Sequence, residues 1–312
     1  MIRKEATGFI KEKTGINKRE FIEKDLILSQ LLFHLSKEKY FFDNYAFKGG
    51  TCLIKCYLGY YRFSEDLDFT YINQKELEGK SMNQMRKLVS DKIDKVAEIL
   101  EKIAKPLDLR FKADKQDKDH FQFGGSNAFV TFKLWYKSTE SDKENFIKLQ
   151  INYIEKLNYA IKEIKAKTLL LKDFEKEFSS LFPEEFEFLK PAKIKTYDIK
   201  EVLIEKIRAI LTRRGVKARD FIDVYKITKL ENLKLEDFKK EIIDKIKAML
   251  KFDKYQTNLD KKQETNFSAD IDKEKIVAEE EKILLVPIPE DFAKFLSEFK
   301  VFLNEIILSL KK

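Results

Sequence analysis

The sequence predicts an α+β fold in which a small mixed sheet is flanked by helices and followed by a helical domain. Segments that alternate polar and apolar residues are concentrated in the middle of the chain, and a long amphipathic segment interrupts them. From about residue 160 onward, apolar residues recur at helical spacing. We therefore expect an N-terminal helical segment at residues 1–45, a core at 46–160 and a mainly helical domain at 161–312.

The composition restricts the class of protein before any motif is considered. Hydrophobic residues make up 43% of the 312 residues, which excludes global disorder and is enough for one large or two ordinary domains. Cys52 and Cys56 are the two cysteines, and there are two histidines, so neither a disulfide scaffold nor a zinc cluster is expected. No apolar run approaches the roughly 18 residues that span a bilayer, so we expect a cytoplasmic protein without a membrane segment.

The net charge has two interpretations. It is +8, but charged residues make up 37% of the chain, so the basic excess is a small difference between large numbers. One interpretation is a phosphate-rich partner, and the other is a Lys- and Glu-rich surface that serves solubility or thermal stability. Composition alone does not choose between them.

The N-terminal segment predicts a helix. Asn17 and Glu20 have the spacing of an N-cap and its N3 partner. Four leucines follow at helical spacing: Leu28, Leu31, Leu32 and Leu35.

The predicted core contains four segments with the alternation typical of strands. They are residues 66–71, 107–111, 129–136 and 146–153. Between the first two, residues 82–103 have the amphipathic period of a long helix. A strand, a long helix and then further strands predict a mixed sheet covered by helices.

The C-terminal part predicts a series of helices. Asp198 and Glu201 resemble a capping box at the start of a helix over 198–211, and another helix begins near Lys217. Residues 239–250 give a third helical pattern.

The end of the chain combines a polar stretch with an aromatic helix. Residues 252–273 are polar and charged and predict a loop or a loosely ordered segment. After Pro287 and Pro289, a final helix carries apolar residues at helical spacing, which we expect to pack in the core: Phe292, Phe295, Phe299, Phe302, Ile306 and Leu310.

The most informative stretch is residues 47–69, FKGGTCLIKCYLGYYRFSEDLDF. Gly49, Gly50 and Thr51 precede a helical apolar pattern, so the glycines stand where a loop meets a helix N-terminus. Glycine at such a place lets backbone N–H groups approach a phosphate closely, and the threonine hydroxyl adds a donor. Because the chain has only nine glycines, an adjacent pair indicates a local backbone requirement.

The same stretch ends in a predicted strand that carries two carboxylates. Residues i and i+2 of a strand project to one face, so Asp66 and Asp68 converge while Leu67 turns into the core. Two carboxylates so close repel each other unless a cation lies between them. Beside a phosphate-binding loop such oxygens favour Mg²⁺, which takes one or two carboxylates together with phosphate oxygens. Each motif alone is weakly specific, but together and in this order they predict a nucleotide–metal site.

These motifs resemble those of the AbiEii/AbiGii toxin-type nucleotidyltransferases, relatives of the DNA polymerase β-like nucleotidyltransferases. The first match is the Gly-Gly-Thr helix start followed by RFSEDLDF at residues 62–69. The second is EVLIEKIRAILTRRGVKARDFIDVY at residues 201–225, which is similar to the family's helix with E-K-x-x-A followed by R-D-x-x-D. The resemblance covers roughly residues 18–230, and the remainder matches only in being helical.

The resemblance implies that residues 46–160 form a nucleotidyltransferase core, and it gives roles to the matching residues. The implied NTP-binding residues are Gly49, Gly50, Thr51, Arg62, Ser64, Lys206 and Arg219. The implied catalytic residues are Asp66, Asp68, Lys206 and Asp220, and the first two also hold the metal, Mg²⁺ or Mn²⁺. Asp223 matches the signature more weakly, and Arg219 is equally compatible with an ion pair to a neighbouring acid.

The second signature also stands out by its charges. Lys206 lies mid-helix among apolar residues, where a lysine is costly unless it is paired or faces a pocket. Five cations follow within twelve residues: Arg208, Arg213, Arg214, Lys217 and Arg219. Arg213 and Arg214 are equally compatible with a solvated helix end. We expect this cluster to face Asp66 and Asp68 across one cleft.

One departure from the polymerase β-like pattern concerns a third carboxylate. Such enzymes usually take it from a neighbouring strand to bind a second metal. The expected strand offers Lys148, Gln150 and Asn152, none of which is a carboxylate. Three alternatives remain open: Asp220 serves as base or ligand, one well-held metal is enough, or the chemistry is lost.

The resemblance implies an enzyme that transfers NMP from an NTP to an acceptor hydroxyl, with the tRNA 3′ end as the expected acceptor. Such a protein would be the toxin of a toxin–antitoxin or abortive-infection pair, held in check by a separately encoded antitoxin protein. Two alternatives stay open: a nucleotidyltransferase that modifies a protein or a small molecule, and an NTP-binding regulator without turnover. The missing third carboxylate favours the regulator, and the presence of both Asp66 and Asp68 argues against it.

Overall fold

The structure is a computed structural model that describes residues 2–124, 128–169, 172–264 and 271–310. The chain divides into two compact units. The first contains residues 1–155 and 161–197, and the second contains residues 156–160 and 198–312. The contacts thus group residues 161–197 with the first 155 residues.

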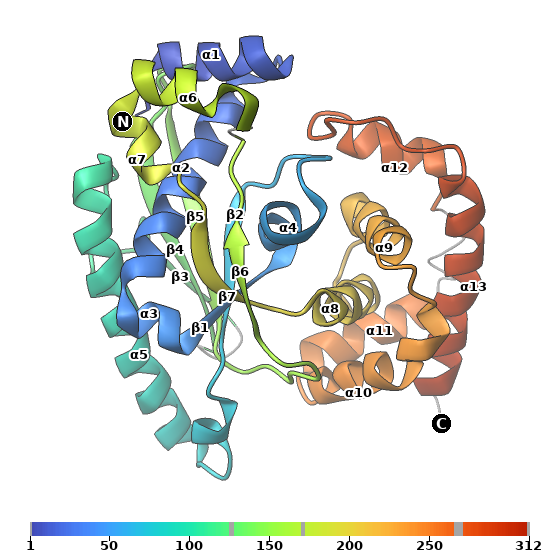
Figure 1. Ribbon diagram of the computed structural model, residues 1–312. Helices are drawn as coiled ribbons and strands as arrows, with labels where there is room; N and C mark the ends of the chain where they lie inside the picture. The colour runs from blue at the N-terminus through green and yellow to red at the C-terminus, as the bar shows by residue number, and fades with distance from the viewer. Residues whose placement is uncertain (1, 125–127, 170–171, 265–270, 311–312) are drawn as a thin grey trace. The chain divides into compact units, whose positions relative to one another are not determined.

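In the described part of the first unit, seven strands form one mixed sheet in the order β3-β4-β5-β2-β1-β7-β6 (Figure 1). The strands are β1 (Tyr45–Lys48), β2 (Asp66–Tyr71), β3 (Phe121–Gly124), β4 (Phe129–Lys137), β5 (Glu144–Asn152), β6 (Lys162–Ala166) and β7 (Ala192–Thr196). β2 is parallel to β5 and β1 is parallel to β7, while the other neighbours are antiparallel. The mixed sheet confirms the predicted α+β class.

Helices cover the two faces of this sheet unequally. α2 (Arg19–Lys37), α3 (Lys39–Asn44) and α5 (Met82–Ala104) lie on one face, and the short α4 (Gly49–Cys52) lies on the other (Figure 1). Phe41 of α3 packs edge-on against Phe69 of β2, with ring centroids 4.8 Å apart. Because alternate strand residues point to opposite faces, Phe69 and the buried Leu67 face these helices. The aspartates on either side of Leu67 therefore face away from them.

A smaller group of helices packs together through phenylalanines. The ring of Phe9 in α1 (Lys4–Thr14) contacts the rings of Phe174, Phe178 and Phe182, with centroids between 5.7 and 5.9 Å apart. The first two belong to α6 (Lys172–Leu181), which is followed by α7 (Pro183–Phe188). These contacts help to place residues 161–197 in the first unit.

Strands β6 and β7 correct the prediction that the chain is helical from about residue 160 onward. Their sequences are KEIKA and AKIKT, so each strand offers few apolar positions. They form because each has a partner in the sheet: β6 pairs with β7, and β7 pairs with β1. Strand formation that depends on such partners leaves little local pattern in the sequence.

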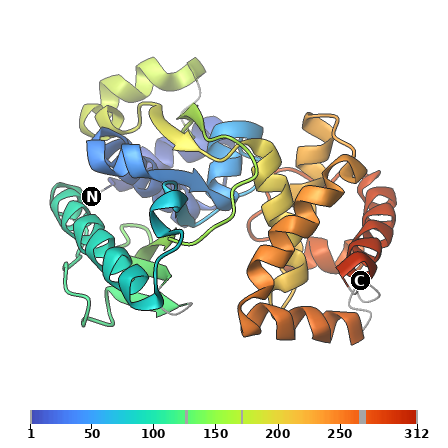
Figure 2. The ribbon, with the colours of Figure 1, turned by 90° about the horizontal axis from the view of Figure 1, so that it is seen from below.

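The regular elements of the second unit, within its described residues, are helices (Figure 2). They are α8 (Ile199–Thr212), α9 (Ala218–Leu230), η4 (Leu235–Phe238), α10 (Lys239–Leu250), α11 (Asp253–Glu264), α12 (Lys273–Glu280) and α13 (Phe292–Leu310). Phe292 and Phe299 of α13 pack edge-on against Tyr225 and Phe221 of α9. The prediction that the aromatic stripe packs in the core is confirmed for Phe292, Phe299, Phe302 and Ile306, whereas Phe295 and Leu310 are half-buried. No helix among the described residues is long and apolar enough to cross a lipid bilayer.

Residues 107–111 do not form the predicted strand. The 3-10 helix η3 (Lys105–Leu107) ends there, and Asp108 adopts a left-handed φ of 56°. Arg110 then forms a single bridge to Trp135 of β4. The first residues of the predicted strand instead form the end of η3 and the turn at Asp108.

Residues 252–273, predicted as a loop, instead contain α11. Its polar side chains are used inside the unit: the amide of Asn258 donates to the carbonyl of Thr212 at 2.9 Å. A helix with such a polar sequence has no apolar stripe, so its period is not visible. Residues 265–270 of this segment lie outside the described residues.

The two predicted helix caps are also built differently. α2 begins at Arg19 without a side-chain cap, so Asn17 and Glu20 do not form the expected pair. Asp198 does cap α8, but Glu201 does not complete a capping box. Its carboxylate instead accepts from the backbone N–H groups of residues 158 and 159.

Candidate functional site

Gly49 stands at the junction between β1 and the helix that begins with α4 and continues as the π-helix η1 (Leu53–Leu58). Its φ of +77° lies in the left-handed region, which a side chain strongly disfavours. A Cβ at this position would lie 2.3 Å from Oδ2 of Asp68. The carboxylate of Asp68 therefore packs directly against the glycine backbone, and any larger residue would displace it.

Gly50 makes an equally close approach to a second pair of predicted residues. A Cβ there would lie 2.7 Å from Nη2 of Arg62 and 3.0 Å from the hydroxyl of Ser64. The guanidinium of Arg62 is buried and donates to the carbonyl of Phe63 at 2.8 Å. The structure thus brings the glycine pair together with Arg62, Ser64 and Asp68.

Thr51 ties the helix start to the strand. Its buried hydroxyl donates to the backbone carbonyl of Asp66 at 2.5 Å and lies 2.9 Å from the hydroxyl of Ser64. In this arrangement the threonine holds the position of β2. Its contact with phosphate stays a prediction.

Asp66 and Asp68 are half-buried and lie on one face of β2, on either side of the fully buried Leu67. Within the described residues, no group of three or more His, Cys, Asp and Glu side chains is arranged to hold a metal ion. Two neighbouring carboxylates do not form a closed cage, but they fit Mg²⁺, which keeps water and substrate phosphate among its ligands. The close approach of Asp68 to the Gly49 backbone places one of these carboxylates at the predicted phosphate loop.

The strand next to the aspartates contributes no carboxylate. Lys148 and Gln150 of β5 lie opposite Asp66 and Asp68, and Asn152 lies opposite Thr70. The register therefore places Lys148 and Gln150 directly beside the aspartates, and Asn152 one step farther along the same face, and none of the three carries a negative charge.

Sequence reasoning missed a buried carboxylate just beyond β5. Glu155 accepts from Nζ of Lys48 at 3.2 Å and from the amide of Asn152 at 3.0 Å. Lys48 lies opposite Asp68 in the register of β1 and β2. A signal was present in the sequence, because Lys48 directly precedes the glycine pair, but its partner is more than a hundred residues away.

A buried ionic network connects the π-helix η1 to α2. Lys55 is 1% exposed and forms an ion pair with Asp25 of α2 at 2.8 Å. Its ammonium also donates to Ser29 and to Tyr60, and the Tyr60 hydroxyl donates to Asp25. Burial, with the nearby Asp25 charge, raises the pKa of Tyr60 well above its usual value. Because a broken buried pair leaves an uncompensated charge, this network fixes the helix that follows the glycines.

A second cluster lies in the second unit, around Lys206 of α8. Its ammonium is 2.6 Å from carboxylate oxygens of both Asp220 and Asp223 of α9. Arg213 contacts the other oxygen of Asp220, also at 2.6 Å. Burial disfavours the charge of Asp220, but Lys206 and Arg213 outweigh it and hold the pKa of this carboxyl below its usual value. Ion pairs with two buried carboxylates thus offset the desolvation free energy of this mid-helix lysine.

The remaining cations of the second signature have different surroundings. Arg214 is exposed, as a solvated helix end predicts, whereas Arg213 is engaged by Asp220. Lys217 is also exposed. Arg208 is buried and contacts Glu205 and Thr212 of its own helix. The backbone N–H of Arg219 donates to Glu280 at 3.0 Å.

Lys262 of α11 is a further lysine near this cluster, and sequence reasoning missed it. Its ammonium is buried and donates to the carbonyls of Ile210 and Gly215. Burial, together with the charge of Arg213, lowers the pKa of Lys262 to about 8. No sequence signal could have found it, because α11 was itself not predicted.

The two clusters lie in different units. The first contains the glycine pair and the two aspartates, and the second contains Lys206 and Asp220. Their meeting at one cleft stays a prediction.

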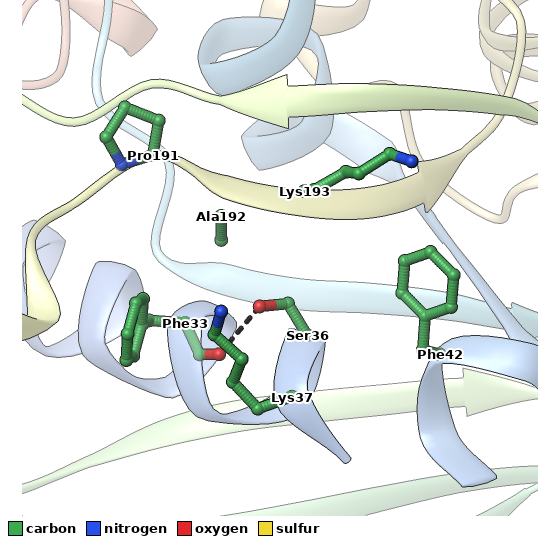
Figure 3. Close-up of a pocket in the computed structure, with 7 residues that line it drawn as sticks. All are labelled: Phe33, Ser36, Lys37, Phe42, Pro191, Ala192 and Lys193. Carbon is green, nitrogen blue, oxygen red and sulfur yellow. Dashed lines mark hydrogen bonds between the residues drawn. The ribbon is translucent and has the colours of Figure 1, made fainter. Parts of the chain in front are cut away.

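A cavity of about 300 Å³ lies elsewhere in the first unit, between α2, α3 and β7. Phe33 and Phe42 stand at its two ends, and Ala192 and Lys193 line it from β7 (Figure 3). Lys193 is engaged by Glu163 at 2.5 Å. The cavity is on the sheet face that carries the helices, opposite Asp66 and Asp68, so it has no part in the site described above.

Comparison with known proteins identifies one family. A family model described as the nucleotidyl transferase AbiEii toxin of a type IV toxin–antitoxin system matches residues 30–306. Comparison with curated proteins gives no match.

Several solved structures are distant likenesses, among them JHP933 and MenT4. JHP933 from Helicobacter pylori has 16% identity and a TM-score of 0.40, with 94% of this chain and 98% of that chain covered. MenT4, a nucleotidyltransferase toxin from Mycobacterium tuberculosis, has 17% identity and a TM-score of 0.41, with 97% and 98% covered. The family model alone carries the assignment.

Proposed function

The chain belongs to the AbiEii family of nucleotidyltransferase toxins of type IV toxin–antitoxin systems, and we propose that it transfers NMP from an NTP to the 3′ end of a tRNA. The family makes the protein a nucleotidyltransferase and a toxin. The tRNA acceptor, Mg²⁺ or Mn²⁺ as the metal, and the roles of single residues are our proposal. The observation that carries it is the close packing of Asp68 against the backbone of Gly49.

Gly49 and Gly50 are the proposed binding loop for the triphosphate. Backbone N–H groups of glycines at a helix start approach phosphate oxygens without a side chain in the way. Arg62 is buried behind Gly50 and orients this loop together with Ser64. Asp66 and Asp68 would hold the divalent metal, which when bound neutralises part of the phosphate charge.

The chemistry needs alignment more than a strong base. An acceptor hydroxyl attacks the α-phosphorus in line, the bond to the bridging oxygen breaks, pyrophosphate leaves, and the hydroxyl proton passes to solvent. Lys206 is the proposed cation for the departing phosphates. We assign Asp220 the role of a positioning residue, because its lowered pKa makes it a weak base and its carboxylate holds Lys206 at 2.6 Å.

Two partners complete the proposal. A separately encoded antitoxin would hold the toxin in check in the cytoplasm, and tRNA would be bound largely through its phosphates and shape. The formal charge of +8 is compatible with such an acceptor.

Incubation of the purified protein with α-labelled NTPs tests the proposal. We expect label to appear on tRNA in the presence of Mg²⁺ or Mn²⁺ and to be lost with a chelator, because two carboxylates without a metal repel both each other and the triphosphate. A protein fraction and a mixture of small hydroxyl compounds are offered in parallel. Label on either of these instead of tRNA would show that the acceptor is a protein or a small molecule. No label on any acceptor would contradict nucleotidyl transfer and favour an NTP-binding regulator.

A further inference from the structure

The sheet face that carries Asp66 and Asp68 continues across β5 and β4 as a row of half-exposed side chains. Paired residues of neighbouring strands share a face. The register puts Lys148 opposite Asp66, and Lys133 opposite Lys148. The aspartates, β5 and β4 all belong to the first unit, so this arrangement lies within one compact body.

Lys133 and Lys148 are like charges directly opposite each other, which destabilises a sheet. In the described part of the chain, neither forms an ion pair with a carboxylate. Both ammoniums lie instead over the ring of Phe146, at 6.0 and 5.7 Å from its centroid. The Lys133 ammonium also donates to the backbone carbonyl of Lys118 at 3.4 Å. The fold therefore keeps two neighbouring cations beside an aromatic face with no carboxylate partner among the described residues, and an anion placed there would relieve the repulsion.

An aromatic pair lies one step farther along the same face. Phe146 and Trp135 are directly opposite each other, and their ring centroids are 4.8 Å apart. Both are half-exposed, whereas the residues of β4 and β5 that point to the other face are buried, apart from the exposed Asn145 near the start of β5. Arg110 lies over the Trp135 ring at 5.4 Å. Two residues along a strand span about 7 Å, so the rings follow the lysines by that distance.

The side chains of this surface indicate which kind of ligand it binds. Half-exposed rings beside two lysines that have no carboxylate partner among the described residues match an unpaired nucleotide, which offers a flat base and a phosphate. A duplex hides its base faces in the stack, and an acidic peptide offers no flat group to the rings. The surface begins at Asp66, which we assign to the reacting triphosphate, so a strand lying along it would end at the site.

We propose that Lys133, Lys148, Trp135 and Phe146 form an acceptor platform that binds the single-stranded 3′ end of the RNA acceptor. This inference rests on the proposed function for the identity of the acceptor. Lys148 and Lys133 bind phosphates next to the acceptor end, and the two rings stack on an unpaired base. The platform approaches the aspartates from the β5 side, where Gln150 adjoins Asp68.

The protein carries a built-in reporter for this proposal. Trp135 is the only tryptophan in the chain, so its fluorescence reports on the platform alone. Titration of the full-length protein with a short single-stranded RNA, without NTP, should quench this fluorescence as a base stacks on the ring. A blunt-ended duplex of the same sequence should bind more weakly, and a polyglutamate peptide should give no quenching.

Variants are measured by anisotropy of a dye-labelled RNA. We expect Trp135→Leu and Phe146→Leu each to weaken binding about tenfold, because stacking contributes strongly to single-strand affinity, and Trp135→Phe to restore most of it. Lys133→Gln and Lys148→Gln should each reduce the slope of log affinity against log salt by about 0.7, the value for one phosphate contact on a single strand. Each variant is first shown to unfold at the wild-type temperature.

Two matched controls lie on the same sheet. Phe123→Leu removes a half-exposed ring of β3 that points to the opposite face, and Lys165→Gln removes an exposed lysine of the far edge strand β6. Both should bind RNA as the wild type does. The platform proposal would be contradicted if the folded platform variants kept the wild-type RNA affinity and salt slope. It would also be contradicted if the control variants lost as much RNA affinity as the platform variants.

The binding assay separates this proposal from the proposed function. RNA binding that follows the predictions, without any transfer of label, would leave the platform in place and refute nucleotidyl transfer to RNA. Transfer of label to RNA by platform variants with wild-type acceptor KM would refute the platform and leave the function in place. Equal binding of the duplex or of the acidic peptide would also refute the single-strand platform.

Discussion

Gly49 is the residue at which the glycine loop and the acidic strand meet. Its positive φ and the 2.3 Å approach of a hypothetical Cβ to Asp68 are independent reasons for glycine at this position. The first is local and belongs to the backbone, whereas the second is tertiary and belongs to the site. A substitution therefore acts on both stability and activity, and a suitable control separates the two.

Gly79 provides that control, because it has a φ of +69° and open space where a Cβ would stand. We expect Gly79→Ala to lower the free energy of unfolding by about 1 kcal/mol through backbone strain and to leave transfer unchanged. Gly49→Ala should carry the same strain and in addition push the Asp68 carboxylate aside, so that transfer falls on the order of 100-fold. Denaturant unfolding and the labelling assay measure the two effects. Equal activity in the two variants would show that the contact between Gly49 and Asp68 has no role in catalysis.

At the scale of elements, one buried ion pair attaches a connecting segment to the helical unit. Glu201 of α8 and Lys245 of α10 are both fully buried, with 2.5 Å between Nζ and Oε1. Glu201 accepts from the backbone N–H groups of residues 158 and 159, and Lys245 donates to the carbonyl of Lys156. These contacts explain why residues 156–160 belong to the second unit although the chain on both sides belongs to the first.

Lys245→Met should therefore detach the segment 156–160. Removing one partner of a buried pair leaves Glu201 uncompensated, for which we expect a loss of about 3–5 kcal/mol in the free energy of unfolding. Protease cleavage within 156–160 should become faster under native conditions, because the backbone there loses its bond from Lys245, and Glu201, which accepts from residues 158 and 159, loses its partner. Lys247→Met, an exposed lysine of the same helix, is the control. Equal stability and equal cleavage of the two variants would contradict this role.

At the scale of the whole molecule, the sequence predicts the strongly patterned parts of the fold. The helix over 82–103 corresponds to α5, the segments at 66–71, 129–136 and 146–153 correspond to strands, and 239–250 corresponds to α10. Each of these has a clear period, because one face is buried along its length. The elements that were missed, β6, β7 and α11, are polar and owe their form to partners elsewhere in the chain.

The same distinction holds for the site. Gly49, Gly50, Arg62, Ser64 and Asp68 were predicted as one group and lie within contact distance, since they occur in one stretch of 20 residues. Residues that enter from distant segments were not predicted: Glu155, Asp25 and Lys262. Their roles depend on which partner the fold brings to them, and no spacing in the sequence records that choice.

The structure shows which of the lysines behind the basic excess have acidic partners. Many surface lysines have an acidic partner, as Lys39 has Asp43 and Lys193 has Glu163. Lys133 and Lys148 differ, because both ammoniums lie over the ring of Phe146 on the face that carries Asp66, and Lys133 also donates to the backbone carbonyl of Lys118. Local arrangement is therefore a better guide to the acceptor than the net charge.

The central claim is that Asp66 and Asp68, beside the glycine loop, act on the reacting triphosphate. The most direct test is the single-turnover rate of α-labelled nucleotide transfer to tRNA by Asp66→Asn and Asp68→Asn, with Asp91→Asn, an exposed aspartate of α5, as control. Each site variant removes one carboxylate charge with little change in shape. We predict that both lose transfer by on the order of 10²–10³-fold or more while unfolding at the wild-type temperature, and that the control transfers normally. A single-turnover transfer rate of either site variant within about tenfold of the wild-type rate would contradict the account, because a change in binding alone can produce a loss that small.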